Sequence, residues 1–348
     1  MSLYLSGKAR IAMMQISFFR LIKWLLVALL VAGLTTSCTQ VTRTNNPPGQ
    51  TGNNAIPSAV SSKEPFNPSS SAATTVFLIM MENHNWSDIA GNPAAPYINK
   101  TLLPIASYTQ AYYNPPGIHP SEPNYLWLEA GTNFGIFDDN PPDINHQSSS
   151  LHLVSLLDHA HIAWKSYQED IPGNVCPLTS TGLYAPKHNP TVYFDNVTDT
   201  NNPGSTYCIT HERPYTELPE NLQKNTVARY NFITPNLCND MHDVCAPLNN
   251  SVQQGDAWLA KQIPLILASQ AYKSGGIIFI TWDEGEGSDG PIGMLVLSPL
   301  AKGHGYSNNI HYTHSSTLRT LQEVFGVTPF LGDAANATDL SDLFRQFP

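Results

Sequence analysis

Short runs of apolar residues recur along the chain and are separated by stretches whose apolar positions follow a helical period. The clearest runs are VFLIMM at 76–81, IIFITW at 277–282 and IGMLVLSP at 292–299, and a weaker one lies in ARYNFITPN at 228–236. Runs that are this short and have no polar face are typical of strands buried on both sides. The hydrophobic pattern therefore predicts buried strands at all four places.

Three segments between these runs have the periodicity of amphipathic helices. They span residues 151–163, 256–271 and 315–325, and the last places Leu318, Leu321, Val324 and Phe325 on one face. Apolar strands that alternate with helices predict an α/β fold, doubly wound, with a mostly parallel central sheet and helices on both faces. In such folds the ligand site lies beyond the carboxyl ends of the strands. Residues 172–225 are rich in Asn, Pro, Thr and Gly, and we expect them to form a long loop or small cap insertion.

The first 38 residues have the layout of a secretory signal. Arg20 and Lys23 precede an apolar run at 24–34, and small residues then lead to Cys38. Cys38 resembles a bacterial lipidation site, although Thr35 stands where such sites usually have leucine. We therefore expect residues 1–38 to be a signal peptide, with a lipoprotein signal as the alternative and a lipidated Cys38 as a candidate membrane attachment.

The chain after the signal divides into a polar segment and a globular domain. Residues 39–73 are mostly Asn, Pro, Ser, Thr and Gly, which is typical of a flexible linker, and the domain spans 74–348. We expect an exported protein that is periplasmic, secreted or anchored to the cell envelope. The net charge of the 348 residues is −10 and no basic stripe appears, which argues against nucleic acid as a partner.

Four cysteines follow the signal, at positions 176, 208, 238 and 245. An even number of cysteines in an exported protein predicts two disulfides. Three pairings are possible, and we favour Cys238–Cys245 as a local loop together with Cys176–Cys208. The alternative is a zinc site in LCNDMHDVC, where a histidine lies between the two cysteines.

Two of the predicted strands end in acidic residues. Glu82 and Asn83 follow the strand at 76–81, and Asp283 and Glu284 follow the strand at 277–282. Carboxylates at the edge of an apolar core must be neutralised, paired or bound to a cation, and hard divalent cations prefer oxygen ligands. The pattern therefore predicts a divalent metal site, whereas we expect the nearby Glu286 and Asp289 to belong to a solvated loop.

Further polar residues follow another strand or begin a helix. ITPNLCNDMHD places Asn236, Asp240, His242 and Asp243 in one loop. His314 precedes Ser315 and Ser316, which are good N-terminal caps, so it stands where a helix end favours anions. Both segments are candidate parts of the same site.

The segment IHPSEPNYLWL holds Ser121 between two prolines. Pro120 and Pro123 restrict the backbone on both sides of the serine, which suits a nucleophile that must be held in place. No G-x-S-x-G motif occurs in the sequence, so a Ser-His-Asp triad of the usual kind is not indicated. A cation held by the acids at the strand ends is the more suitable activator of the Ser121 hydroxyl.

Five blocks in order resemble the phosphoesterase family of bacterial acid phosphatases and phospholipases C, in the alkaline phosphatase superfamily. They are VFLIMMENHNWSDIAG, HPSEPNYLWLEAG, ITPNLCNDMHD, FITWDEGEG and YTHSSTLRTLQEVFG, and the resemblance runs from about residue 75 to 343. It implies a metal-dependent phosphoesterase, which the signal would export, in which Ser121 forms a phosphoseryl intermediate on a small phosphorylated substrate or a phospholipid head group.

The resemblance also implies roles for individual residues. One or two divalent cations would be bound by Glu82, Asn83, Asp283, Glu284 and the Ser121 oxygen, with Asp240 as a further ligand. His119 and Asn124 would flank the phosphate. His242 and His314 would bind phosphoryl oxygens, protonate the leaving group or support a second metal.

Three alternatives to an acid phosphatase are compatible with parts of the sequence. A sulfatase is disfavoured because Tyr125 stands where the sulfatase motif beginning at Ser121 requires arginine. A phospholipase C is disfavoured because such members of the family generally have an added C-terminal domain. A catalytically inactive surface-binding lipoprotein would keep the fold without the activity, which the complete set of candidate ligands argues against.

Overall fold

The computed structural model describes residues 74–287 and 289–348. The predicted signal peptide at 1–38, including Cys38, and the predicted linker at 39–73 lie outside the described residues. No helix in the described part of the chain is long and apolar enough to span a membrane.

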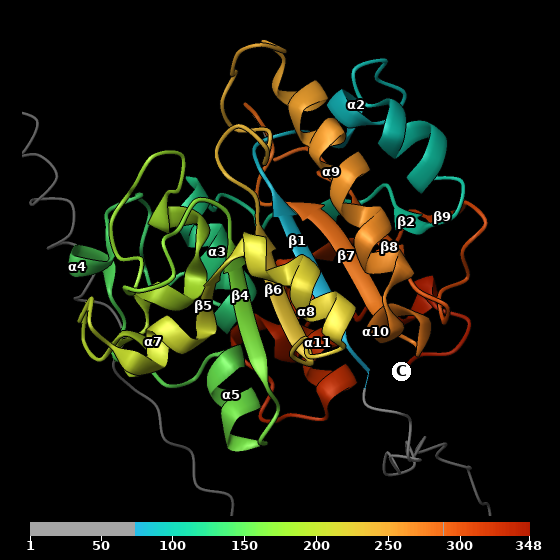
Figure 1. Ribbon diagram of the computed structural model, residues 1–348. Helices are drawn as coiled ribbons and strands as arrows, with labels where there is room; N and C mark the ends of the chain where they lie inside the picture. Colours follow the sequence, from blue (N-terminus) through green and yellow to red (C-terminus); the bar gives the residue numbers. More distant parts are fainter. Residues whose placement is uncertain (1–73, 288) are drawn as a thin grey trace, which may run out of the picture. The chain divides into compact units, whose positions relative to one another are not determined.

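An eight-stranded mixed sheet forms the centre of the domain (Figure 1). In spatial order its strands are β5 (Glu212–Pro214), β4 (Trp164–Gln168), β6 (Tyr230–Thr234), β1 (Val76–Met81), β7 (Ile277–Trp282), β8 (Met294–Leu297), β2 (Ser107–Thr109) and β9 (Tyr306–Asn308). Of these strands only β8 runs antiparallel to its neighbours. The predicted mostly parallel sheet is confirmed, and all four predicted strands are present.

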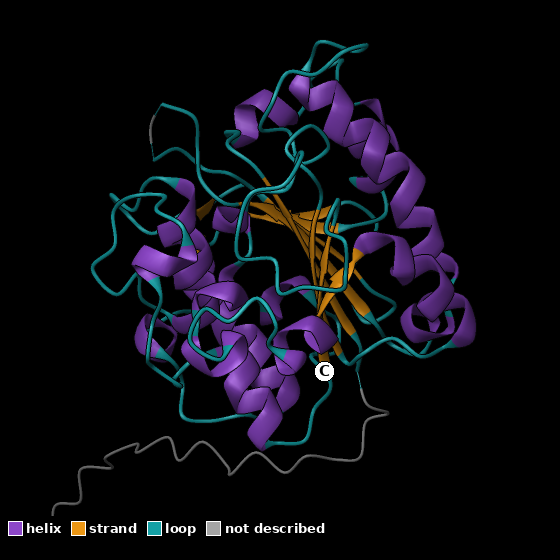
Figure 2. Cartoon of the chain, turned by 60° about the vertical axis from the view of Figure 1, so that its left-hand side comes forward, coloured by secondary structure: helices purple, strands orange, loops and turns teal. Residues whose placement is uncertain are grey.

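Helices cover both faces of this sheet (Figure 1 and Figure 2). One group consists of α3 (Ser121–Ala130), α5 (Leu153–His159) and α11 (His314–Phe325), and the other consists of α8 (Leu218–Lys224), α9 (Ser251–Ala268) and α10 (Gln270–Lys273). Every residue of the central strands β1 and β7 is buried as a result, which explains why both appear in the sequence as unbroken apolar runs.

The predicted helices are present with shifted ends. The helix expected at 256–271 begins earlier, after Asn250, whose side chain accepts a hydrogen bond of 2.8 Å from the backbone N–H of Gln253. The helix expected at 151–163 is shorter, because α5 ends at His159. Residue His314 is the first residue of α11, one position before the predicted start.

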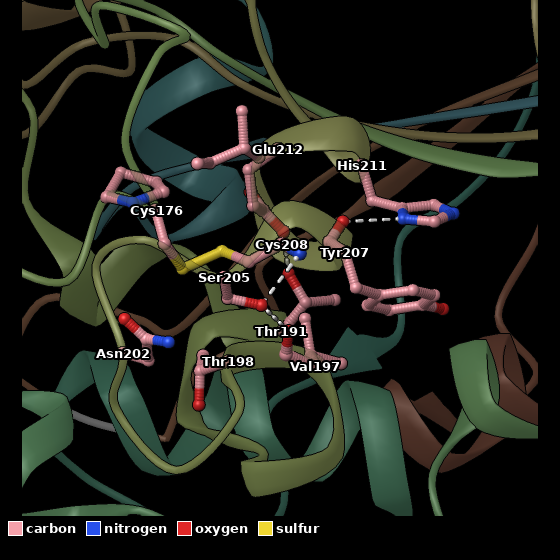
Figure 3. Close-up of a disulfide and its surroundings, with 12 residues drawn as sticks. Cys176, Thr191, Val197, Thr198, Asn202, Ser205, Tyr207, Cys208, His211 and Glu212 are labelled. Carbon is pink, nitrogen blue, oxygen red and sulfur yellow. Dashed lines mark hydrogen bonds between the residues drawn. A yellow bond between two sulfur atoms is a disulfide. The ribbon is translucent and has the colours of Figure 1, made fainter.

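The insertion at 172–225 contains more regular structure than the expected loop. It contributes the edge strand β5, the helix α7 (Thr206–His211) and α8, which packs near α9. The disulfide between Cys176 and Cys208 joins the start of the insertion to α7 (Figure 3). The insertion also contains the short helix α6 (Asp195–Thr198). Short elements elsewhere are α2 (Trp86–Ile89), α4 (Pro142–Asn145) and a parallel pair formed by β3 (Tyr112–Tyr113) and β10 (Tyr312–Thr313).

Candidate active site

The loops that follow β1, β6 and β7 meet at one edge of the sheet because these three strands are parallel neighbours. The backbone N–H of Glu82 donates to the carbonyl oxygen of Asp240 at 2.8 Å. The backbone N–H of Asn83 donates to Asp283 Oδ1 at 2.9 Å. The acids predicted from separate strand ends are therefore held together by direct hydrogen bonds between their loops.

Ser121 is the first residue of α3 and faces this cluster of acids. Its hydroxyl donates to Glu82 Oε2 at 3.1 Å, and the hydroxyl of Tyr125 donates to Glu82 Oε1. Asn124 Nδ2 donates to Glu284 Oε2 at 3.2 Å and to the carbonyl oxygens of Ile118 and Pro120. Positions separated by three and four residues share one face of a helix, so a single turn of α3 directs all three side chains at the acids.

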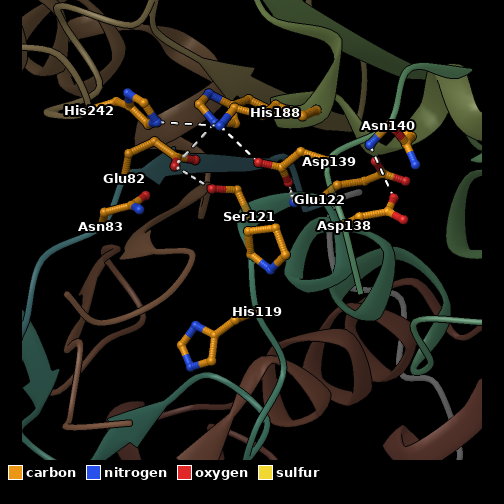
Figure 4. A network of polar contacts seen from close by, with 12 residues as sticks. Glu82, Asn83, His119, Ser121, Glu122, Asp138, Asp139, Asn140, His188 and His242 are labelled. Atoms are coloured by element: carbon orange, nitrogen blue, oxygen red, sulfur yellow. Dashed lines mark hydrogen bonds and ion pairs between the residues drawn. The ribbon is translucent and has the colours of Figure 1, made fainter. Parts of the chain in front are cut away.

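His188 is a member of the cluster that the sequence interpretation missed (Figure 4). It is buried, its Nδ1 lies 3.3 Å from Asp240 Oδ2, and its ring stacks on Tyr125 with centroids 5.4 Å apart. Its Nε2 lies 3.2 Å from Glu82 Oε2, although the angles are not those of a hydrogen bond. One ligand atom each from Glu82, His188 and His242 lies within 4.8 Å of the others.

A signal for His188 was present in the sequence. It lies in PKHNP, where Pro186 and Pro190 flank it much as prolines flank Ser121. The segment stands inside the insertion that was expected to be irregular. No predicted strand or amphipathic helix ends next to His188, so the sequence pattern did not place this residue at the site.

Lys187 precedes His188 in the chain and brings a positive charge to the acid cluster. Its Nζ lies 3.1 Å from Asp139 Oδ2 and 3.4 Å from His242 Nε2. Burial alone would lower the pKa of Lys187, but the charges of Asp139 and Glu82 outweigh burial and raise it. Asp139 also accepts a hydrogen bond of 3.0 Å from the backbone N–H of Glu122, which follows Ser121.

The carboxyl groups of the cluster are buried close to one another. Burial, followed by repulsion from Asp283 and Asp240, raises the pKa of Glu82 well above its usual range. Burial also raises the pKa of Asp240 and of Asp283. The pKa of Glu284 is raised to about 7 by burial and by the charge of Asp283. Such a cluster is stable at neutral pH when protons or a cation balance its charge.

Several buried oxygen atoms at this site lack a hydrogen-bond partner among the described residues. They are Asn83 Oδ1, Asp240 Oδ2 and Asp283 Oδ2. Buried polar atoms are normally satisfied, and oxygen atoms without partners beside crowded carboxyl groups are suited to coordinate a cation. The donor set, which is rich in oxygen, fits a hard divalent metal ion.

A model of the Phosphoesterase family matches residues 109–328 of the chain. The chain belongs to this family. It is therefore a hydrolase that acts on phosphate esters. The phosphatidylinositol-3-phosphatase of Mycobacterium tuberculosis is 32% identical to it over 270 residues, covering 77% of this chain and 82% of that protein. A phosphate-repressible acid phosphatase of Penicillium chrysogenum is 30% identical over 225 residues, and the match spans only 51% of the fungal protein.

Solved structures show that this phosphoesterase has the fold of the alkaline phosphatase superfamily. A superfamily protein from Vibrio parahaemolyticus superposes with a TM-score of 0.54 at 11% identity, covering 77% of this chain and 69% of that one. Human ectonucleotide pyrophosphatase/phosphodiesterase 5 superposes with a TM-score of 0.51 at 11% identity, covering 78% of this chain and all of that one. At these identities the similarity concerns the fold alone.

His119 of the phosphoesterase lies between two acids at the outer edge of the cluster. Its Nδ1 contacts Glu284 Oε2, and its Nε2 lies 2.6 Å from Asp289 Oδ1. Asp289 also accepts a hydrogen bond of 3.1 Å from the backbone N–H of Gly117. Asp289 is exposed in a loop, as the sequence suggested, with 43% of its side chain accessible, although it also contacts His119, and the side chain of Glu286 is 74% exposed.

His314 lies behind the loop that carries Asp283. The ring is fully buried, its Nε2 donates to the carbonyl oxygen of Asp283 at 2.5 Å, and its Nδ1 lies 3.1 Å from the Tyr112 hydroxyl. Burial lowers the pKa of His314 to about 4, so the ring is neutral near pH 7. Because both ring nitrogens have protein partners, the structure gives His314 a position that supports Asp283 rather than one that reaches a substrate.

The loop after β6 supplies Asp240 and His242 and is closed by a disulfide. The favoured pairing is present, with Cys238 bonded to Cys245 and Cys176 bonded to Cys208. His242 Nδ1 lies 2.7 Å from Asp243 Oδ1, and the backbone N–H of His242 donates to Asp240 Oδ1 at 2.8 Å. The disulfide therefore fixes a short loop in which two candidate site residues are already hydrogen-bonded.

Replacing Cys238 and Cys245 with serine is expected to lower kcat/KM at least about 10-fold at limiting metal concentration, because the loop no longer holds Asp240 and His242 in place. The loss of unfolding free energy is expected to be about 2–3 kcal/mol for this short loop. Steady-state kinetics over a metal titration and chemical denaturation provide the two measurements.

The other disulfide is the matched control for this variant. Cys176 and Cys208 are separated by 32 positions, so replacing both with serine is expected to cost about 3–4 kcal/mol of stability. Activity under folding conditions should nevertheless change by less than about threefold, since these cysteines do not touch the acid cluster. Equal activity losses in the two variants would show that the Cys238–Cys245 loop has no particular role in the site.

Proposed function

We propose that this phosphoesterase is an exported, metal-dependent phosphomonoesterase that uses Ser121 as its nucleophile. The observation that carries the proposal is the position of the Ser121 hydroxyl, which is fixed at the start of α3 and bonded to Glu82 inside the acid cluster. A serine hydroxyl is a weak nucleophile without activation, and no histidine lies within hydrogen-bond distance of Ser121 among the described residues. Activation by the cluster is the mechanism that the geometry supports best.

The residues that would hold a divalent cation are Glu82, Asn83, Asp283, Glu284 and the Ser121 oxygen. Asp240 and His188 adjoin Glu82 and would extend the donor set there. A bound cation would lower the pKa of the Ser121 hydroxyl and neutralise charge on the phosphoryl group.

The protein's own groups carry out the positioning and the proton transfers. The Ser121 proton points at Glu82 Oε2, which is the acceptor nearest to it. As the Ser121 oxygen forms its bond to phosphorus, the bond to the leaving alkoxide breaks. His242, whose side chain is 28% exposed, would protonate that alkoxide, and its Nε2, which faces Lys187 Nζ at 3.4 Å in the free enzyme, would have to carry the proton at this step. Attack by water on the phosphoserine then releases inorganic phosphate and restores Ser121.

The remaining predicted residues act as supports in this proposal. Asn124 directs both protons of its amide at protein oxygens, and one of these oxygens belongs to Glu284. His119 holds Glu284 from the other side and is exposed enough to meet a substrate. His314 positions Asp283 through the backbone of that residue. We therefore place Asn124 and His119 beside the phosphate site and His314 behind Asp283, without giving any of the three a share in bond breaking.

Two observations support the substrate class and the location. The relatives are named as a phosphatidylinositol-3-phosphatase and as acid phosphatases, which favours phosphate monoesters. Two disulfides are the usual mark of an oxidising compartment, which favours export. The candidate signal at 1–38 agrees with export, and Cys38 is the candidate lipid attachment.

The deciding experiment compares an aryl phosphate monoester with a phospholipid as substrates of the purified protein. We expect release of inorganic phosphate from the monoester and slower or no release of a phosphorylated head group from phosphatidylcholine vesicles. The opposite preference would identify a phospholipase C. Turnover of neither substrate, with no metal found by elemental analysis, would identify a binding protein.

A further inference from the structure

Lys187 is fixed next to the nucleophile by a bridge that the proposed mechanism does not use. Asp139 accepts from Lys187 Nζ through one oxygen and from the backbone N–H of Glu122 through the other. Glu122 follows Ser121 directly in α3. In Figure 4 the two partners of the lysine, Asp139 and His242, lie on either side of His188 with Ser121 below them. The bridge sets the position of the ammonium group relative to the serine.

The ammonium group of Lys187 keeps a proton available for another acceptor. A lysine ammonium has three N–H donors, and two partners are present among the described residues, Asp139 Oδ2 and His242 Nε2. His242 Nδ1 lies 2.7 Å from Asp243 Oδ1, so its Nδ1 carries the proton and its Nε2 can accept from lysine. The side chain of Lys187 is 22% exposed, so the lysine is not sealed inside the protein, and no third partner of its Nζ is present among the described residues.

The charges around the site give this third donor a specific use. Glu82, Asp283 and Glu284 already offset the charge of one divalent cation. A phosphate monoester carries nearly two negative charges above about pH 7, whereas a diester carries one. A single additional cationic group therefore favours the monoester over the diester, and its hydrogen bonds to phosphoryl oxygens are charge-assisted.

We propose that Lys187 binds a phosphoryl oxygen of the substrate and makes the enzyme selective for dianionic phosphate monoesters over diesters, with Asp139 as the residue that positions it. The inference rests on the proposed phosphoesterase site. It adds a substrate-binding cation supplied by the protein and a structural reason for discrimination between two classes of phosphate ester.

The test compares Lys187→Met with the wild-type protein on two substrates at a saturating concentration of metal. The substrates are para-nitrophenyl phosphate, a monoester, and methyl para-nitrophenyl phosphate, a diester. We expect kcat/KM for the monoester to fall about 10- to 100-fold and kcat/KM for the diester to change less than about threefold. The inhibition constant of inorganic phosphate should rise by about the same factor by which kcat/KM for the monoester falls.

Two further variants separate charge from structure. Lys187→Arg keeps the positive charge and should recover part of the selectivity for the monoester. Asp139→Asn keeps an oxygen that can accept from the backbone N–H of Glu122, but it weakens the ion pair with Lys187. It should therefore lower the ratio of kcat/KM for the monoester to kcat/KM for the diester, by a smaller factor than Lys187→Met does. A merely structural role for either residue would lower both activities together.

Lys302→Met is the matched control, because Lys302 is also a partly buried lysine and its Nζ lies 3.0 Å from an aspartate, Asp342. It changes the net charge equally and should leave the ratio of the two activities unaltered. Equal losses on both esters in Lys187→Met, or an unchanged inhibition constant for phosphate, would overturn the proposal. Wild-type protein that hydrolyses neither ester would instead overturn the proposed function.

Discussion

Replacing Ser121 with alanine is expected to lower kcat for an aryl phosphate monoester at least about 10³-fold. The Ser121 hydroxyl is directed at Glu82 by the first turn of α3, and alanine leaves no oxygen to attack phosphorus. Steady-state hydrolysis of para-nitrophenyl phosphate measures this loss. A second measurement uses acid-quenched wild-type enzyme, in which the peptide containing Ser121 should gain one phosphoryl group.

The control for this variant must preserve the fold and the metal. Ser155 is a buried serine in α5, and Ser155→Ala should keep nearly full activity. With metal in excess, Ser121→Ala should unfold within a few degrees of the wild-type protein, since four of the five proposed ligands remain and only one hydroxyl is removed. Turnover at the wild-type rate in Ser121→Ala, or a phosphoryl group found on another residue, would refute Ser121 as the nucleophile.

Residues directly before or after a regular element were accessible from the sequence. Glu82 follows a run of six apolar residues, and such a run must be a buried strand whose end reaches the edge of the sheet. Ser121 stands between prolines that fix its backbone at the beginning of a helix. The order of the strands was not accessible in this way, and it is the parallel neighbourhood of β6, β1 and β7 in the structure that brings the acids together.

Residues that depend on side-chain direction or on irregular backbone were less accessible. His188 lies in the short turn Pro186–His188, whose position is set by packing of the whole insertion rather than by a local period. His314 begins a helix as expected, yet its ring turns towards Tyr112 and the backbone of Asp283. Such orientations result from tertiary contacts between residues that are far apart in the chain, and no spacing rule includes them.

Removal of the divalent cation is expected to reduce monoester hydrolysis to about 1% or less of its initial value and to lower the unfolding temperature at neutral pH. The first effect follows because the Ser121 hydroxyl loses its activator. The second follows because the buried acids, chiefly Glu82, Asp240 and Asp283, then repel one another or take up protons. The measurements are turnover and thermal unfolding after dialysis against a chelator, and again after a divalent metal is added back.

The pH dependence of this destabilisation has a definite sign. A carboxyl group whose folded-state pKa is raised contributes stability at low pH and loses it as pH rises from the unfolded pKa towards the folded one. The pKa values of Glu82, Asp240, Asp283 and Glu284 are all raised, the last to about 7. The metal-free protein should therefore become less stable from about pH 4 upwards to neutral pH, and the gain from metal should widen over the same range because fewer protons compete with the cation.

The variant Asp283→Asn distinguishes a metal site from a cluster of acids that happen to be close. It removes one negative charge while keeping an oxygen for the backbone N–H of Asn83. Without metal it should be more stable than the metal-free wild-type protein at neutral pH, because a repelling charge is gone. With metal it should be less stable than the wild-type protein, because a ligand is gone. This reversal requires a cation at the acid cluster. If Asp283→Asn is more stable than the wild-type protein under both conditions, or less stable under both, a metal site at the cluster is contradicted.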